Sequence, residues 1–281
     1  MTALRAVNNW TQQRWQNLIG WLSLGLITAN GIVAFAAPFV TGAQMDGSSS
    51  DSARLTETPL LMALITGACL IVLFANLGPS LSSKSVALIG VLVGINAILR
   101  LVDVNFLLPG EFSPIFLLIT LVGYSFGARL GFLMGALTLL VSALITGGVG
   151  PWLPFQMYTA GWMGMTAGWL RVVPALRADR LSVPRAVIML TVFGFVWGLL
   201  YGAIMNLYNW PFLTGGGWQP GLSGAAMLRA YGVFYLAQSL GMDLARAVGN
   251  AVLMLVLGAP LLNIFRRFRQ RFAYQVVHDA S

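Results

Sequence analysis

The apolar stretch AVIMLTVFGFVWGLLYGAIMNL, residues 186–207, decides the fold class of this chain. It contains no charged residue, and as a helix rising about 1.5 Å per residue it can cross the roughly 30 Å hydrocarbon core of a bilayer. Residues 171–185, directly before it, contain four arginines and two prolines. A basic loop followed by a long apolar run is typical of a membrane helix that enters from the cytoplasm.

The composition of the whole chain also favours a membrane protein. Of the 281 residues, 58% are hydrophobic and 9% are charged, whereas a soluble domain averages about 25% charged residues. The sequence therefore excludes a water-soluble protein. The formal net charge is +8, but the basic residues lie mostly at the ends of apolar runs, where anionic lipid headgroups account for them. A nucleic-acid partner is not predicted, because no basic groove with stacking aromatics is evident.

Seven further segments have the length and composition of membrane spans. They are residues 18–40, 59–78, 86–102, 114–126, 130–146, 155–170 and 242–265. Only helices or closed barrels satisfy the backbone in lipid, so we predict an all-α integral membrane protein with about eight transmembrane helices. Residues 227–240 are expected to form an amphipathic helix on the outer surface, with a bend at Gly241.

The charges alternate from one side of these spans to the other. Basic residues occupy alternate gaps and both ends of the chain, namely Arg5, Arg14, Lys84, Arg129, Arg171, Arg177, Arg180, Arg185, Arg266, Arg267, Arg269 and Arg271. The other gaps contain mainly acids, namely Asp46, Asp51, Glu57, Asp103 and Glu111. Short loops rich in Lys and Arg stay in the cytoplasm. We therefore expect both termini to be cytoplasmic and a polar site to lie on the outer half.

Asp243 and Arg246 are the one charged pair inside a predicted span. At a spacing of three residues they share a helix face and can form an ion pair. Ionisable groups inside a membrane usually face a cavity or a partner. Two interpretations stay open: a substrate-binding or gating pair, and a structural bridge near the outer surface.

Further candidate ligand-binding residues lie at the outer ends of other spans. Arg100 lies at the outer end of the third span, and Asn105 lies just beyond it. The guanidinium of Arg100 can bind an anionic or carbonyl-bearing ligand, extend to the outer headgroups or pair with Asp103. Residues 147–157 combine three glycines with two prolines, and irregular backbone at a membrane edge generally lines a cavity. The remaining candidates are Trp152 and Gln156 in that segment, and Asn206, Asn209 and Trp210 at the end of the seventh span.

A stripe of small residues runs along the third span. Ala87, Gly90, Gly94 and Ala97 follow one another at helical spacing, which permits close approach of another helix. That helix can belong to this chain or to a partner protein.

Several kinds of chemistry are missing from the sequence. A phosphate-binding loop of the Gly-x-x-x-x-Gly-Lys-Ser/Thr type is absent, which excludes ATP binding of that kind. The single histidine, His278, lies in the tail, and no acidic cluster suits a metal ion. The sequence therefore predicts no catalytic residue, no metal site and no cofactor.

Five stretches resemble the substrate-binding S component of energy-coupling factor (ECF) transporters. They are residues 87–100, 112–116, 123–127, 147–157 and 239–246. The most specific is the Gly-x-Gly-Pro-Trp-x-Pro-Phe-Gln-Met element that ends at Met157. The resemblance implies a six-helix core over residues 85–265, preceded by a two-helix addition over residues 1–84 and followed by a basic cytoplasmic tail over residues 266–281.

The resemblance also implies a function. S components are multi-pass proteins of the prokaryotic plasma membrane that bind a vitamin from outside and act with a T component and two cytoplasmic ATPases. Gly90 and Gly94 would then contact the T component. S components for cobalamin and related corrinoids are the most similar to residues 147–157, while riboflavin, pantothenate and nucleobase precursors stay open. The alternative is a stand-alone secondary transporter or channel, for which Asp243 is the one candidate coupling group.

Overall fold

A computed structural model describes residues 2–41, 64, 66–68, 70–71, 75, 83–106, 112–177, 179–213, 217–219 and 221–278. Its α-helices are α1 (Thr2–Thr41), α3 (Ser83–Phe106), α4 (Ile115–Phe126), α5 (Ala128–Thr146), α6 (Leu153–Trp169), α7 (Val183–Asn209), α8 (Gly224–Gln238) and α9 (Leu240–His278). Three short 3₁₀ helices are η2 (Leu170–Val172), η3 (Pro174–Leu176) and η4 (Trp210–Phe212). The described residues contain no strand, which confirms the all-α prediction.

Four helices are long and apolar enough to cross a membrane. They are Arg14–Val40, Ala128–Thr146, Val183–Phe212 and Leu240–Gln270. The apolar helix Ile115–Phe126 is shorter, as the sequence predicted for the fourth span. Most of the predicted second span, residues 59–78, lies outside the described residues, so the count of eight spans stays a prediction.

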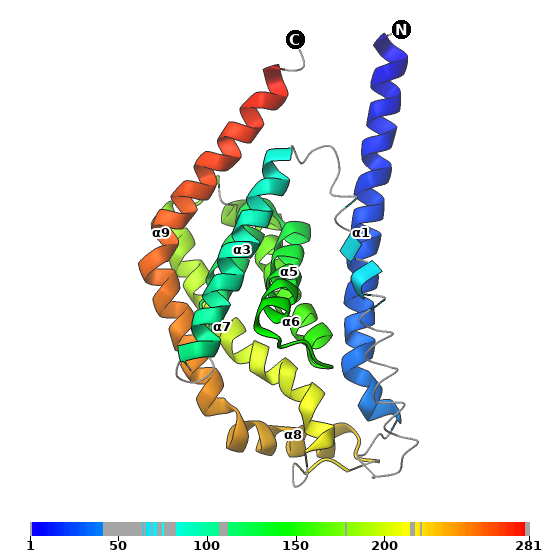
Figure 1. Ribbon diagram of the computed structural model, residues 1–281, viewed down its shortest axis with the longest axis vertical. Helices are drawn as coiled ribbons and strands as arrows, with labels where there is room; N and C mark the ends of the chain where they lie inside the picture. The colour runs from blue at the N-terminus through cyan, green and yellow to red at the C-terminus, as the bar shows by residue number, and fades with distance from the viewer. Residues whose placement is uncertain are drawn as a thin grey trace.

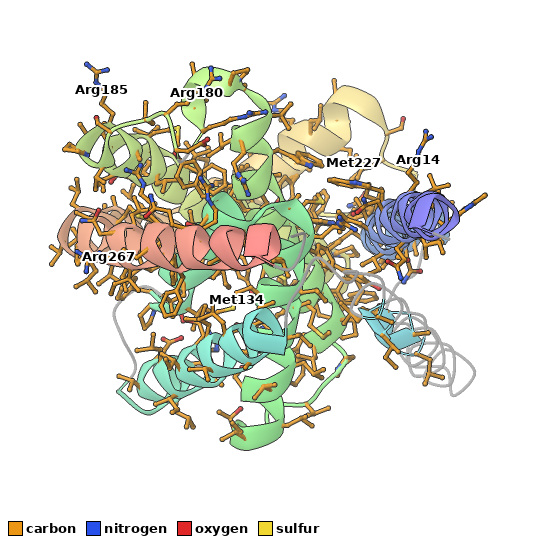
Figure 2. The ribbon with its side chains drawn as sticks, turned by 90° about the horizontal axis from the view of Figure 1, so that it is seen from above. Arg14, Met134, Arg180, Arg185, Met227 and Arg267 are labelled. Atoms are coloured by element: carbon orange, nitrogen blue, oxygen red, sulfur yellow. The ribbon has the colours of Figure 1, made fainter. Side chains whose placement is uncertain are left out.

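The helices form a bundle around α4, α5 and α6. Helix α3 packs on α4 and α5, while α7 and α9 form a second pair that contacts α4. Helix α1 lies on the other side of the central helices, against α6 (Figures 1 and 2). The start of α1 and the end of α9 point to the same end of the molecule, and α8 crosses the opposite end (Figure 1).

Close approach at glycines holds α5 against α6 and α7 against α9. A Cβ at Gly131 of α5 would overlap the backbone of Gly164 in α6. Between α7 and α9, a Cβ at Gly198 would overlap the backbone of Ala247. Lipid tails are as apolar as the helices, so close packing of small residues, rather than hydrophobic burial, drives association in a membrane. The glycines therefore fix which faces of these helices meet.

Helix α1 is joined to the bundle by polar and aromatic contacts. Asn30 Nδ2 donates a hydrogen bond of 2.6 Å to the hydroxyl of Tyr158 in α6, and that hydroxyl also contacts Thr66 Oγ1. The Phe35 ring meets Phe155 edge-on, with 4.9 Å between ring centroids. These contacts attach the N-terminal segment to α6.

The loop between α6 and α7 is tied down at the end of the bundle that carries the termini. Tyr124 of α4 donates a 2.9 Å hydrogen bond to the carbonyl of Leu176. Arg266 of α9 donates one of 2.6 Å to the carbonyl of Leu181. A hydrogen bond from its own backbone lowers the pKa of Asp179, and the nearby Arg269 lowers it further. Other arginines here, namely Arg180, Arg185 and Arg267, project from the edge of the molecule (Figure 2).

Some predicted boundaries differ from the structure. The bend expected at Gly241 occurs at Ser239, between α8 and α9. Helix α9 then continues to His278, so most of the predicted tail is helical. Helix α1 begins at Thr2, well before residue 18. Apolar periodicity marks only the part of a helix that lipid or protein surrounds, and the ends that extend into water lack this signal.

A glycine-to-alanine pair tests the contact between α7 and α9. We expect Gly198→Ala to lower the free energy of unfolding by about 1–3 kcal/mol, because the added methyl overpacks the helix contact. Gly194→Ala is the matched control, since the nearest atom to a Cβ there is Cβ of Asn250 at 3.7 Å. Thermal denaturation of both variants in one detergent measures the difference. Equal stabilities would contradict the close approach.

Candidate functional site

A cavity of about 1130 Å³ opens at the end of the bundle that α8 crosses. Its walls come from the C-terminal half of α7, from α8 and from the start of α9, with Gln156 contributed by α6. Small-molecule sites usually measure about 300–1,000 Å³. The cavity is therefore large enough for a bulky ligand.

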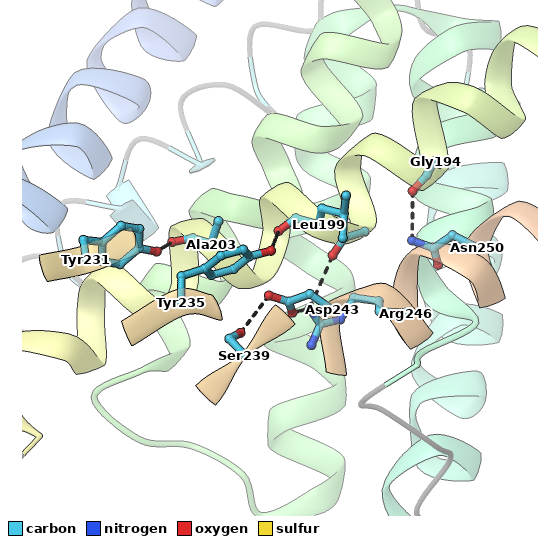
Figure 3. A network of polar contacts seen from close by, with 10 residues as sticks. Gly194, Leu199, Ala203, Tyr231, Tyr235, Ser239, Asp243, Arg246 and Asn250 are labelled. Atoms are coloured by element: carbon cyan, nitrogen blue, oxygen red, sulfur yellow. Dashed lines mark hydrogen bonds and ion pairs between the residues drawn. The ribbon is translucent and has the colours of Figure 1, made fainter. Parts of the chain in front are cut away.

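A buried ion pair forms part of the cavity wall. Arg246 and Asp243 contact each other through Nη1 and Oδ1, and their side chains are 3% and 1% exposed. Ser239, at the bend between α8 and α9, donates a 2.7 Å hydrogen bond to the second carboxylate oxygen (Figure 3). Charges in a low-dielectric interior need such partners to offset the loss of hydration.

Helix α7 provides further contacts of the Arg246 guanidinium. Its Nη1 lies 3.5 Å from the carbonyl of Gly198, and its Cζ lies 5.4 Å from the centre of the Tyr201 ring. A guanidinium over an aromatic face is attracted by the ring's electrons. One helical turn along α7, Gly202 leaves the space that the Asp243 carboxylate occupies, since a Cβ there would overlap it.

The polar network continues along α9 into the bundle. Asn250 Nδ2 donates a 3.2 Å hydrogen bond to the carbonyl of Gly194 (Figure 3). Its Oδ1 has no hydrogen-bond partner among the residues described. From Asp243 to Asn250, polar groups of α9 thus face α7 over about two turns.

Two tyrosines fasten α8 to α7 at the cavity. Tyr235 donates a 3.4 Å hydrogen bond to the carbonyl of Leu199, and Tyr231 donates to that of Ala203 (Figure 3). The Tyr231 ring also meets the buried Trp210 edge-on, with 5.1 Å between centroids. Helix α8 buries just one of its residues, Phe234. It therefore forms a wall of the cavity while staying largely outside the core.

The structure brings five of the nine predicted ligand residues to this one cavity. They are Gln156, Asn206, Asn209, Asp243 and Arg246. They come from three helices whose proximity the sequence does not reveal. The cavity is also lined by four residues that are not among the nine predicted ligand residues, namely Tyr201, Arg229, Gln238 and Ser239. One feature of the sequence could have identified Arg229 as a candidate. It is a basic residue on the side of the spans where acids predominate.

Three of the other four predicted ligand residues lie elsewhere. Trp210 is fully buried against Phe39, Tyr231 and Phe234, outside the cavity lining. Trp152 is 44% exposed and is not among the lining residues. Arg100 pairs with Asp103 across 2.8 Å on α3, which is the alternative that the sequence left open. The side chain of Asn105 lies outside those described.

The small-residue stripe of α3 divides into an open part and a buried part. Ala87 and Gly90 are exposed, and Gly94 is half-buried. Added Cβ atoms at both glycines would meet nothing within 4 Å among the described atoms. Ala97 is fully buried and packs inside the chain. An α-helix turns about 100° per residue, so a row ten residues long drifts from the open face into the core.

One comparison with known proteins gives a match. Residues 84–258 match the model of the family described as ECF transporter, substrate-specific component. No curated protein and no solved structure matches the chain. The family match spans α3 to the first half of α9, which includes part of every helix that lines the cavity. It also covers more than half of the 281 residues, and the chain therefore belongs to the family of substrate-specific components of ECF transporters.

Proposed function

We propose that this chain captures a vitamin or related micronutrient at the outer face of a prokaryotic cell membrane. It delivers the ligand together with a T component and two cytoplasmic ATPases. The cavity of about 1130 Å³ between α7, α8 and α9 is the observation that carries the proposal. Family membership adds that the chain is a substrate-binding subunit rather than an enzyme.

The orientation follows from the distribution of charge. Arg266 and Arg269 hold the loop between α6 and α7 at one end of the bundle. The start of α1 and the C-terminal end of α9 lie at this same end (Figure 1). An arginine-rich end belongs in the cytoplasm. The cavity, at the α8 end, then opens to the outside. The family match begins at residue 84, which supports a substrate-binding core over residues 85–265 behind a separate N-terminal addition.

A corrinoid such as cobalamin is the ligand that we favour. The size of the cavity supports this choice of ligand, because it exceeds the usual range for small-molecule sites. A stand-alone secondary transporter is less consistent with the site. Such a protein needs an ionisable coupling group in the membrane, and the carboxylate of Asp243 is already held by Arg246 and Ser239.

The open face of α3 is our candidate for the T-component contact. Gly90 and Gly94 leave free space along this helix, and Val91, Ile95 and Ile98 beside them are exposed large apolar residues. Small residues on an apolar helix let a partner helix approach closely. The cavity is lined by other helices, so the two surfaces can be tested separately.

A ligand screen tests the proposed function directly. The purified chain in detergent is heated with cobalamin, cobinamide, riboflavin, pantothenate, biotin or thiamine. We expect one compound to raise the melting temperature without ATP, because a ligand at 100 times its Kd stabilises the folded state by about 2.7 kcal/mol. Calorimetry then gives the affinity. Absence of any shift with folded protein would contradict vitamin capture.

Variants of the ion pair separate ligand contact from structural support. We expect Arg246→Ala to lower the free energy of unfolding by about 3–5 kcal/mol, because Asp243 is left as an unpaired buried charge. The double variant Asp243→Leu with Arg246→Met should recover most of this stability and still bind the vitamin more weakly than the native chain. Thermal denaturation and calorimetry measure the two effects. Unchanged affinity in the double variant would make the pair a structural bridge alone.

A second pair of variants tests the face of α3. Gly90→Leu combined with Gly94→Leu should weaken co-purification with the T component at least about tenfold, because leucine side chains block close helix approach. Ligand affinity should stay within about twofold, since these added side chains point away from the described atoms of the core. Gly25→Leu on α1, where a Cβ also meets nothing, is the control. Equal loss of partner and ligand binding would contradict this assignment.

A further inference from the structure

We propose that the ligand carries an acidic group, a carboxylate or a phosphate, and that Arg229 of α8 binds this group. Asn206 of α7 donates a second hydrogen bond to the same ligand. The inference rests on the proposed function, because it concerns the same cavity. It assigns the ligand's charge, which neither the family nor the cavity volume determines.

The charged side chains of the described cavity lining include one more cation than anions. Three charged residues line the cavity: Arg229, Asp243 and Arg246. Asp243 and Arg246 neutralise each other in their ion pair. The ion pairs found between described residues do not include Arg229. A recess with a net positive charge and low-dielectric walls attracts an anion and repels a cation.

The position of Arg229 on α8 directs it to the cavity. Ala226, Ala230 and Val233 line the cavity with it, and residues three and four positions apart share one face of a helix. Small neighbours leave room for the long arginine side chain. The planar guanidinium can donate two parallel hydrogen bonds to a carboxylate or a phosphate.

A residue of α7 with an unsatisfied buried donor belongs to the lining of the same cavity. Asn206 lines the cavity, and its Nδ2 is buried without a hydrogen-bond partner among the described residues. An unsatisfied buried donor costs free energy that a ligand acceptor recovers on binding. The amides of Gln156 and Asn209 also line this wall. Among its described lining residues, the cavity therefore combines one cation outside any ion pair with several hydrogen-bond donors.

Arg229 is an exposed residue, so the phosphate of a lipid headgroup is a second source of the same chemistry. Lipid binding would need only the outer rim of α8. Ligand binding also needs Asn206, which belongs to the wall that α7 forms. The two sources are distinguished by whether substitutions on both helices weaken binding of the same soluble compound.

The test uses compounds that differ in one acidic group. The pairs are pantothenate and pantothenol, biotin and biotinamide, and nicotinate and nicotinamide. Cobalamin is compared with cobinamide, which lacks the nucleotide loop of cobalamin and, with it, the phosphodiester. Each is added to the full chain in detergent free of phospholipid, followed by calorimetry. We expect the acidic member of one pair to bind at least about tenfold more tightly than its partner, because charge-assisted hydrogen bonds are the stronger ones.

Three variants connect that preference to the proposed residues. Arg229→Gln should weaken binding of the acidic compound about tenfold or more and abolish the preference within the pair, whereas Arg229→Lys should keep part of it. Asn206→Ala should weaken binding several-fold. Arg267→Gln is the matched control, since Arg267 is an exposed arginine on the C-terminal part of α9 (Figure 2). Its affinity should equal that of the native chain.

The outcomes that overturn the inference differ from those that overturn the proposed function. Equal or tighter binding of the neutral member, or of cationic thiamine, overturns the acidic ligand and leaves vitamin capture in place. The same holds if Arg229→Gln changes only the stabilisation by added phosphatidylglycerol, which would make Arg229 a lipid contact. If the folded chain binds none of the compounds, vitamin capture and this inference fail together.

Discussion

The ion pair between Asp243 and Arg246 is the interaction on which the rest of the site depends. Two charges buried to within a few per cent persist in a membrane helix only where the geometry and the additional hydrogen bonds are good. Gly198 and Gly202 of α7 provide both, by letting the backbone of α9 approach and by leaving room for the carboxylate. The cavity lies beside this contact because α7 and α9 converge there.

Hydrogen bonds to backbone carbonyls contribute at both ends of the molecule. Backbone carbonyls of the loop between α6 and α7 accept hydrogen bonds from arginine and tyrosine at one end. At the other end, α8 is attached chiefly through Tyr231 and Tyr235 and buries little of its own surface. Elements with few buried contacts are the ones that open most easily. Of the cavity walls, α8 is therefore the one whose movement would disturb the bundle least.

The candidate site could be predicted from the sequence only in part. Asp243 and Arg246 were identifiable because charges inside an apolar run are rare. Trp210 was grouped with the site because it follows Asn206 and Asn209 in sequence, yet its ring turns inward against Phe39 and Tyr231. Arg229 was missed because an arginine in an amphipathic segment looks like a solvated charge. Side-chain direction decides these cases, and it depends on neighbours from distant parts of the chain.

The sequence by itself determined the helical membrane character, because long apolar runs satisfy their backbone in lipid only as helices. It also determined the distribution of charge along the chain and the resemblance to S components that the family match confirms. The tertiary structure decided which helix ends meet around one cavity, how the stripe from Ala87 to Ala97 divides between open face and core, and where α1 attaches. Those outcomes depend on close contacts between residues far apart in sequence, and hydropathy periodicity contains no information about them.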